Sequence, residues 1–185
     1  MNDRTFEEPV DTLLHWLSNA KRSQRGHYAT AHAYQRRHLF LGIPVVILST
    51  AIGTSVFATL EKDVAIGWRI ATGLMSVATV ILSALQTFLA FGEKSARHRQ
   101  AAAGYGAVKR QIQEAMHTLA DTTLEVSSVL KPIREKLDSL ANEAPQIPDS
   151  IWDGVRKELP GKTLAHYTRK LQEPVAMVAS KPNEA

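Results

Sequence analysis

The side chains that could carry out chemistry are spread along this chain without catalytic spacing. There is no HExxH pair, no GxSxG, no GxGxxG, no GxxxxGK[ST] and no cysteine nucleophile, and Gly104-Tyr105-Gly106 is too short to cradle a phosphate. No pair of histidines shares a helix face with a nearby carboxylate at the spacing of metal ligands. We therefore expect no enzyme, no metal site and no cofactor. The histidines in question are His15, His27, His32, His38, His98, His117 and His166.

One set of polar residues does recur at helical spacing, and it lies inside an otherwise apolar stretch. At about 100° per residue these side chains fall within one arc of roughly 80°, and the opposite arc holds large aliphatic and aromatic residues. Such a stripe is typical either of a seam between packed helices or of the wall of a water-filled pore. The candidate pore-lining residues are Thr72, Ser76, Thr79, Ser83 and Gln86.

Gln86 is the most informative member of this stripe. Hydroxyl groups can bond to carbonyls of their own helix, whereas the amide of Gln86 needs partners that lipid cannot supply. A preceding apolar stretch carries a narrow face of small residues, Gly42, Ser49 and Gly53, which suits close helix packing. Two helices cannot enclose a lumen, so a pore also requires a homo-oligomer.

Basic residues flank the two apolar stretches and form a collar. Two interpretations are open: contact with lipid headgroups, worth about 1 kcal/mol per residue near an anionic surface, or a ring that binds the phosphates of a nucleotide messenger or RNA. The chain as a whole is only mildly basic, with a net charge of +4. The collar residues are Arg36, Arg37, Lys94, Arg97 and Arg99.

The elements that must position these residues are two charge-free stretches, residues 39–60 and 70–91. Each has 22 residues, so as a helix each reaches about 33 Å, enough to cross a hydrocarbon core of about 30 Å. The alternative is a pair of buried helices in a soluble domain. The short connection at 61–69 predicts a two-transmembrane helical hairpin with an extracytoplasmic loop.

Lysines and arginines indicate how this hairpin is oriented. They are frequent before residue 39 and after residue 91, whereas the loop has only Lys62 and Arg69, offset by Glu61 and Asp63. The positive-inside rule then places both termini in the cytoplasm. The polar, acidic N-terminus does not resemble a signal peptide, and we expect the inner (cytoplasmic) membrane of a bacterium as the location.

The remaining chain predicts long cytoplasmic helical extensions, which makes the fold all-α. Residues 1–38 form a helix that continues into the first span, residues 92–160 form further helices, and residues 161–185 form a partly disordered segment. Apolar seams at three- and four-residue spacing run through both extensions. They predict packing within the chain, with packing between subunits as the alternative. Pro132 either kinks a helix or begins one, and Asp149 is expected to cap a short helix.

Several short motifs resemble SLATT domains when they are taken together in order. The first is His38-x-x-Leu41-Gly42-Ile43-Pro44-Val45-Val46-x-x-Ser49-x-x-x-Gly53-Thr54-x-x-Phe57. The second is Glu93-Lys94-x-x-Arg97-His98-x-x-Ala101-Ala102-x-x-Tyr105 with Ile112, and the third is Pro132-Ile133-Arg134 followed by Ala144-Pro145-x-Ile147-Pro148 and Trp152. The resemblance covers roughly residues 12 to 160.

The resemblance implies a function for the chain. SLATT domains are two-transmembrane effector domains of bacterial nucleotide-signalling conflict systems. They are thought to form pores that damage the inner membrane of phage-infected cells. Their partners are nucleotide cyclases, SLOG proteins or reverse transcriptases, so a nucleotide second messenger is one expected signal. We expect no fused sensor domain in this chain, and the resemblance implies no catalytic residue. A non-conducting membrane scaffold that recruits a partner, and an ordinary small ion channel, are the alternatives.

Overall fold

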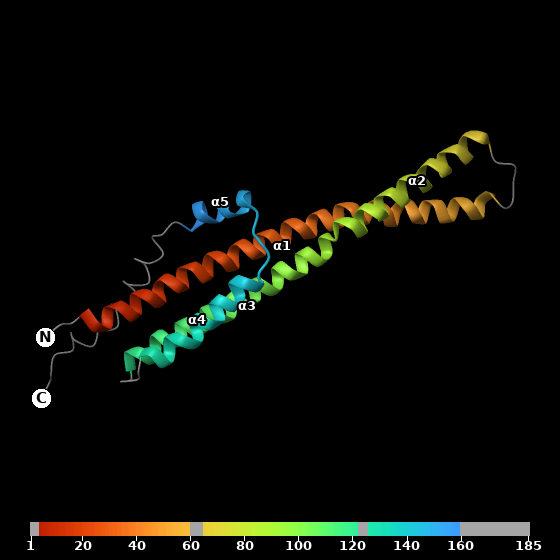
Figure 1. Ribbon diagram of the computed structural model, residues 1–185. Helices are drawn as coiled ribbons and strands as arrows, with labels where there is room; N and C mark the ends of the chain where they lie inside the picture. The colour runs from red at the N-terminus through yellow and green to blue at the C-terminus, as the bar shows by residue number, and fades with distance from the viewer. Residues whose placement is uncertain (1–3, 60–64, 122–125, 160–185) are drawn as a thin grey trace, which may run out of the picture. The chain divides into compact units, whose positions relative to one another are not determined.

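The computed structural model describes residues 4–59, 65–121 and 126–159, and within these residues every regular element is a helix. The five helices are α1 (Arg4–Thr59), α2 (Ile66–Leu89), α3 (Phe91–Asp121), α4 (Val126–Glu143) and α5 (Asp149–Glu158) (Figure 1). The all-α prediction is confirmed for this part of the chain. The predicted segment 161–185, and residues 61–64 of the predicted loop, lie outside the described residues.

The chain divides into two compact units, each described below by itself. Unit 1 comprises residues 1–30 and 98–185, and unit 2 comprises residues 31–97, which include both charge-free stretches. Helix α1 contributes to both units without interruption, as the absence of proline and turn clusters between residues 10 and 38 predicts. Gly26 lies inside this helix without breaking it. The missing side chain lets Ile147 pack close to the helix backbone, because a methyl group at position 26 would lie 2.8 Å from Ile147 Cδ1.

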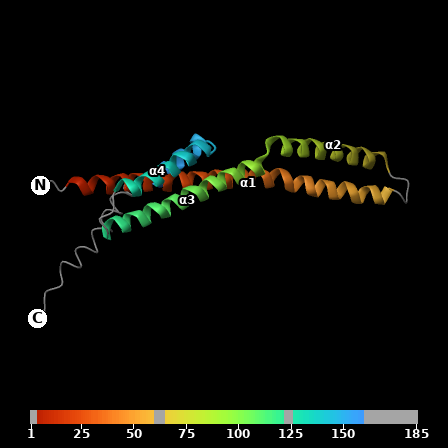
Figure 2. The same ribbon diagram turned by 60° about the horizontal axis from the view of Figure 1, so that its bottom comes forward.

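The core of unit 1 is formed by the apolar seams that the sequence spacing predicts. Leu13 and Leu17 of α1 pack with Val108 and Ile112 of α3 and with Ile133 of α4, and all five are at most 5% exposed. Packing within the chain is therefore confirmed for these seams. Gly104 brings α3 close to α4, since a methyl group there would lie 2.5 Å from Leu140 Cδ2. Figure 2 shows from a second direction that α4 runs close to α1 and α3.

Two predicted helix boundaries can be compared with the structure. Asp149 is the first residue of α5, and the capping residue is Pro148, which makes no side-chain hydrogen bond to the helix; the expected Asp149 cap is therefore wrong by one position. Pro132 is the seventh residue of α4, so of the two alternatives left open for this proline the start of a helix is excluded. The helix ends at Glu143, before the proline-rich connection, as expected.

Unit 2 contains the second half of α1, all of α2 and the first residues of α3. Helix α2 ends at Leu89, and its capping residue Ala90 has left-handed backbone angles (φ 46°, ψ 39°) and donates its N–H to the Gln86 carbonyl. The next helix begins at Phe91. Helix α2 therefore ends two residues before the end of the predicted span 70–91. Ser95 donates a hydrogen bond of 2.9 Å to the Ala31 carbonyl, which joins α3 to α1 within the unit.

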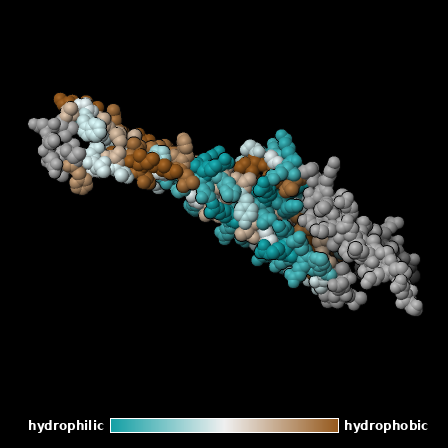
Figure 3. All heavy atoms as spheres, turned by 180° about the vertical axis from the view of Figure 1, so that it is seen from behind, coloured by the Kyte–Doolittle hydropathy of each residue, from teal (hydrophilic) through white to brown (hydrophobic). Residues whose placement is uncertain are grey.

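Unit 2 exposes many large apolar side chains. Apart from Tyr28, every exposed large hydrophobic side chain among the described residues lies between Leu39 and Phe88, and α2 has no buried residue. Figure 3 shows this surface in brown, in contrast to the hydrophilic surface of the described part of unit 1. Two helical segments, Pro9–Phe57 and Ile66–Thr118, are long and apolar enough to cross a membrane, and the most apolar stretch of each is not buried. Because water-soluble monomers rarely expose so large an apolar surface, these segments indicate a membrane location.

Candidate functional site

The polar stripe of α2 lies mainly at half-buried positions. Thr72, Thr79, Ser83 and Gln86 are half-buried within unit 2, whereas Ser76 is exposed. The hydroxyls of Thr72 and Thr79 donate to the carbonyls of Trp68 at 3.0 Å and Met75 at 2.8 Å. Because these hydroxyl groups are satisfied by their own helix, they do not by themselves require water.

Gln86 packs against the glycine that the sequence analysis assigned to helix packing. A methyl group at Gly42 would lie 3.2 Å from Gln86 Nε2 and 3.7 Å from Gln86 Oε1, so the absence of a side chain on α1 makes room for the amide. The amide forms no hydrogen bond with any described residue, although it lies in a charge-free stretch. An amide in such surroundings requires water or a second polar group.

The rest of the small-residue face of α1 is not used within unit 2. Ser49 and Gly53 are exposed, and a methyl group at Gly53 would meet nothing within 4 Å. The half-buried positions of this part of α1 instead include Val45, Leu48 and Ile52, at spacings of three and four residues. Gly42 therefore takes part in packing inside the chain, and the packing role of Ser49 and Gly53 stays a prediction.

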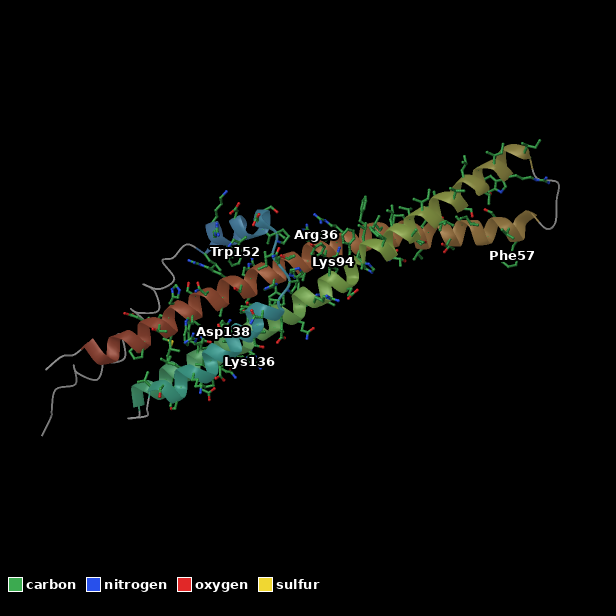
Figure 4. The ribbon with its side chains drawn as sticks, viewed as in Figure 1. Arg36, Phe57, Lys94, Lys136, Asp138 and Trp152 are labelled. Atoms are coloured by element: carbon green, nitrogen blue, oxygen red, sulfur yellow. The ribbon has the colours of Figure 1, made fainter. Side chains whose placement is uncertain are left out.

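The basic collar consists of residues in different environments. Arg97 is paired with Glu93, with 2.6 Å between Nη2 and Oε1, and both side chains are largely exposed; such a pair contributes little to stability. Arg36 forms no ion pair with a described residue, and Figure 4 shows it on α1 and Lys94 on α3. Arg99 is exposed and belongs to unit 1, so it is not grouped with the others.

Two collar residues of unit 2 lie over aromatic rings. Arg37 lies 5.8 Å from the ring centre of Tyr34 and 6.0 Å from that of Phe91. Lys94 lies 5.8 Å from the same Phe91 ring, and the two rings stack with centres 5.9 Å apart. Cations in this geometry are attracted by the ring faces. The sequence analysis identified these cations but missed the role of Phe91, which it treated only as the last residue of an apolar stretch.

A buried pair of histidines lies in unit 1. The Nδ1 atoms of His27 and His98 are 2.9 Å apart, so one imidazole donates to the other, and each side chain is only 3% exposed. The Tyr105 ring stacks on His27 with centres 5.6 Å apart. Burial lowers the pKa of His98 from its ordinary value. No group of three or more metal-binding side chains occurs among the described residues.

Unit 1 is expected to lose stability as the pH falls from 7 to 5. Burial, together with the charge of His98, lowers the pKa of His27 from 6.5 to about 4. Between these values the unfolded chain binds a proton that the folded chain does not, so the stability present above pH 6.5 is lost as the pH falls. The pKa values given correspond to a loss of about 2 kcal/mol between pH 7 and pH 5.

Denaturant unfolding of the full chain at both pH values measures this loss. Replacing both rings, His27→Phe with His98→Phe, keeps two aromatic rings of similar size without titratable groups and should reduce the pH dependence of the free energy of unfolding. An equally steep pH dependence in the double variant means that other groups cause it.

Comparison with known proteins gives no further information on this chain. No protein-family model matches the chain, and no curated protein or solved structure is similar to it. The resemblance to SLATT domains is thus carried only by the short motifs quoted above.

Proposed function

We propose that the chain is an oligomeric membrane effector that forms a pore or disrupts the inner membrane in a bacterial anti-phage, abortive-infection system. The exposed apolar surface of unit 2 supports the membrane part of this proposal. The order of motifs that resembles SLATT domains supports the defence part. In this proposal residues 39–60 and 70–91 form the transmembrane hairpin, and both termini are cytoplasmic because the lysines and arginines flank the hairpin rather than its loop.

The observation that carries the pore is the side chain of Gln86. Its amide lies in a charge-free helix and has no hydrogen-bond partner among the described residues. In a monomer surrounded by lipid this arrangement costs free energy, and an assembly in which Gln86 faces water or a second copy removes that cost. The exposed Ser76 on the same stripe and the open face at Ser49 and Gly53 are compatible with further copies around a shared lumen.

The signal that activates the effector is also part of the proposal. A nucleotide second messenger, or an upstream protein such as a nucleotide cyclase, a SLOG protein or a reverse transcriptase, would act on unit 1 or on the collar. We assign no enzymatic activity to the chain. The scaffold alternative is weakened because the seams that could recruit a partner pack against each other in the core of unit 1.

The proposal is tested by inducing the chain in bacteria that carry a membrane-potential dye. The wild-type chain should depolarise the membrane and arrest growth. The double variant Ser83→Leu with Gln86→Leu should insert normally but abolish depolarisation, because it makes the last two positions of the stripe apolar. Thr87→Leu is the matched control: Thr87 is exposed, lies beside the stripe, and donates only to the Ser83 carbonyl.

Each other outcome selects another function. Unchanged depolarisation by a well-inserted double variant contradicts the stripe as a pore wall. Depolarisation without growth arrest favours an ordinary channel. No depolarisation by the wild-type chain, together with one stoichiometric partner in a pull-down, favours the scaffold.

A further inference from the structure

A groove in unit 2 combines an apolar floor with two arginines. It has a volume of about 550 Å³ and lies between α1 and the junction of α2 with α3. Phe40, Leu41 and Leu89 supply its apolar lining, and Arg36 and Arg37 line it as well. Phe40 is 79% exposed, so a large apolar ring is available to whatever enters the groove.

The charge of this groove is not neutralised within the described residues. Neither Arg36 nor Arg37 forms an ion pair there, in contrast to Arg97, which is paired with Glu93. Arg37 is held over Tyr34 and Phe91 by their ring faces, and ring contacts of this kind leave the N–H groups at the edge of a guanidinium able to donate to an anion.

The groove also lies where the character of the chain changes. The two arginines immediately precede the charge-free stretch that begins at Leu39, and Leu89 is the last residue of α2. An occupant therefore needs an anionic group next to a long apolar part. A free nucleotide meets only the first requirement, because its base and sugar present polar groups that the apolar lining leaves without hydrogen bonds.

We infer that this groove binds one anionic phospholipid, with the phosphate at Arg36 and Arg37 and an acyl chain along Phe40, Leu41 and Leu89. The inference rests on the proposed membrane location and adds to it a specific lipid partner. Arginine donates paired hydrogen bonds to phosphate oxygens, and the apolar lining removes acyl carbons from water. The lipid thus binds as a ligand of unit 2 rather than only as solvent.

The experiment measures the lipid that stays with the purified full chain in a mild non-ionic detergent, by mass spectrometry. The chain is washed with a mixture of phosphatidylglycerol and phosphatidylcholine, and the wild type should retain phosphatidylglycerol selectively. Arg36→Gln with Arg37→Gln should lower this retention about 30-fold, as expected for two lost cation contacts. Ala33→Phe, which keeps both charges but fills the groove, should also displace the lipid.

The control and the opposing outcomes separate this inference from the proposed function. Arg97→Gln removes one charge of the same type outside the groove and should retain the lipid. If the Arg36→Gln, Arg37→Gln variant still fractionates with membranes and retains as much phosphatidylglycerol as the wild type, lipid binding in the groove is contradicted but the membrane location is not. Displacement of the lipid by millimolar inorganic phosphate overturns it too, because it shows a phosphate site without an acyl site. A chain found only in the soluble fraction overturns the membrane proposal instead.

Discussion

Arginines placed at both Val46 and Val77 are expected to remove the chain from the membrane fraction of cells. Val46 is 65% exposed on α1 and Val77 is 58% exposed on α2, and both lie inside the charge-free stretches. An arginine near the centre of a membrane span costs about 2.5 to 3.5 kcal/mol, so two of them cost about 6 kcal/mol. Fractionation by ultracentrifugation without detergent, followed by immunoblotting, measures the result.

The same substitutions distinguish a membrane segment from a soluble domain with exposed apolar residues. At an exposed position in water, valine to arginine changes stability by about 0.5 kcal/mol or less, so a soluble chain would be insensitive to the double variant. Ala103→Arg, at an exposed position of α3 in unit 1, is the matched control and should stay with the membranes. A wild-type chain that remains in the supernatant as a monomer contradicts the membrane location and every proposal that rests on it.

Replacing Leu17 by alanine is expected to destabilise unit 1 by about 2 to 5 kcal/mol. Leu17 is 2% exposed and belongs to the cluster in which α1 meets Val108 and Ile112 of α3. The truncation removes buried methyl groups and leaves a cavity that three packed helices cannot fully collapse. Denaturant unfolding in detergent, followed by the fluorescence of Trp16 beside this cluster, measures the loss.

The matched control uses the same chemical change on an exposed residue. Leu74 is 67% exposed on α2, so Leu74→Ala removes the same atoms without leaving a cavity and should change the free energy of unfolding by about 0.5 kcal/mol or less. Equal destabilisation by both variants would contradict the assignment of the core to the seam of α1, α3 and α4.

The fold was predictable from sequence where one periodic pattern decides it. Leu13, Leu17 and Ile112 recur at helical spacing, and a helix with one apolar face must bury that face. The helix ends were less predictable. Ala90 takes a left-handed conformation that alanine rarely adopts, and Gly92, the residue that such a conformation favours, lies two positions away within α3. Helix ends depend on how the helices pack against one another, and the helix propensities of the individual residues do not include this packing.

The site was predictable only in its composition. Gln86 and Gly42 were each identified from their own helices, but their contact depends on the register between two helices, which no spacing along one helix fixes. The same holds for His27 and His98, which are 71 residues apart and become a hydrogen-bonded pair only once α1 and α3 are aligned. The pairing of Arg97 with Glu93 was within reach, because four residues separate them on one helix.

Helix α1 is continuous, whereas one residue with left-handed backbone angles separates α2 from α3. Helix α1 runs as one hydrogen-bonded helix from Arg4 to Thr59. The left-handed backbone of Ala90 instead separates α2 from α3, and such a residue can absorb changes in backbone angle as a pivot. Within unit 2, α2 and the first residues of α3 can therefore change their mutual orientation by rotation at this one residue, without loss of hydrogen bonds inside either helix.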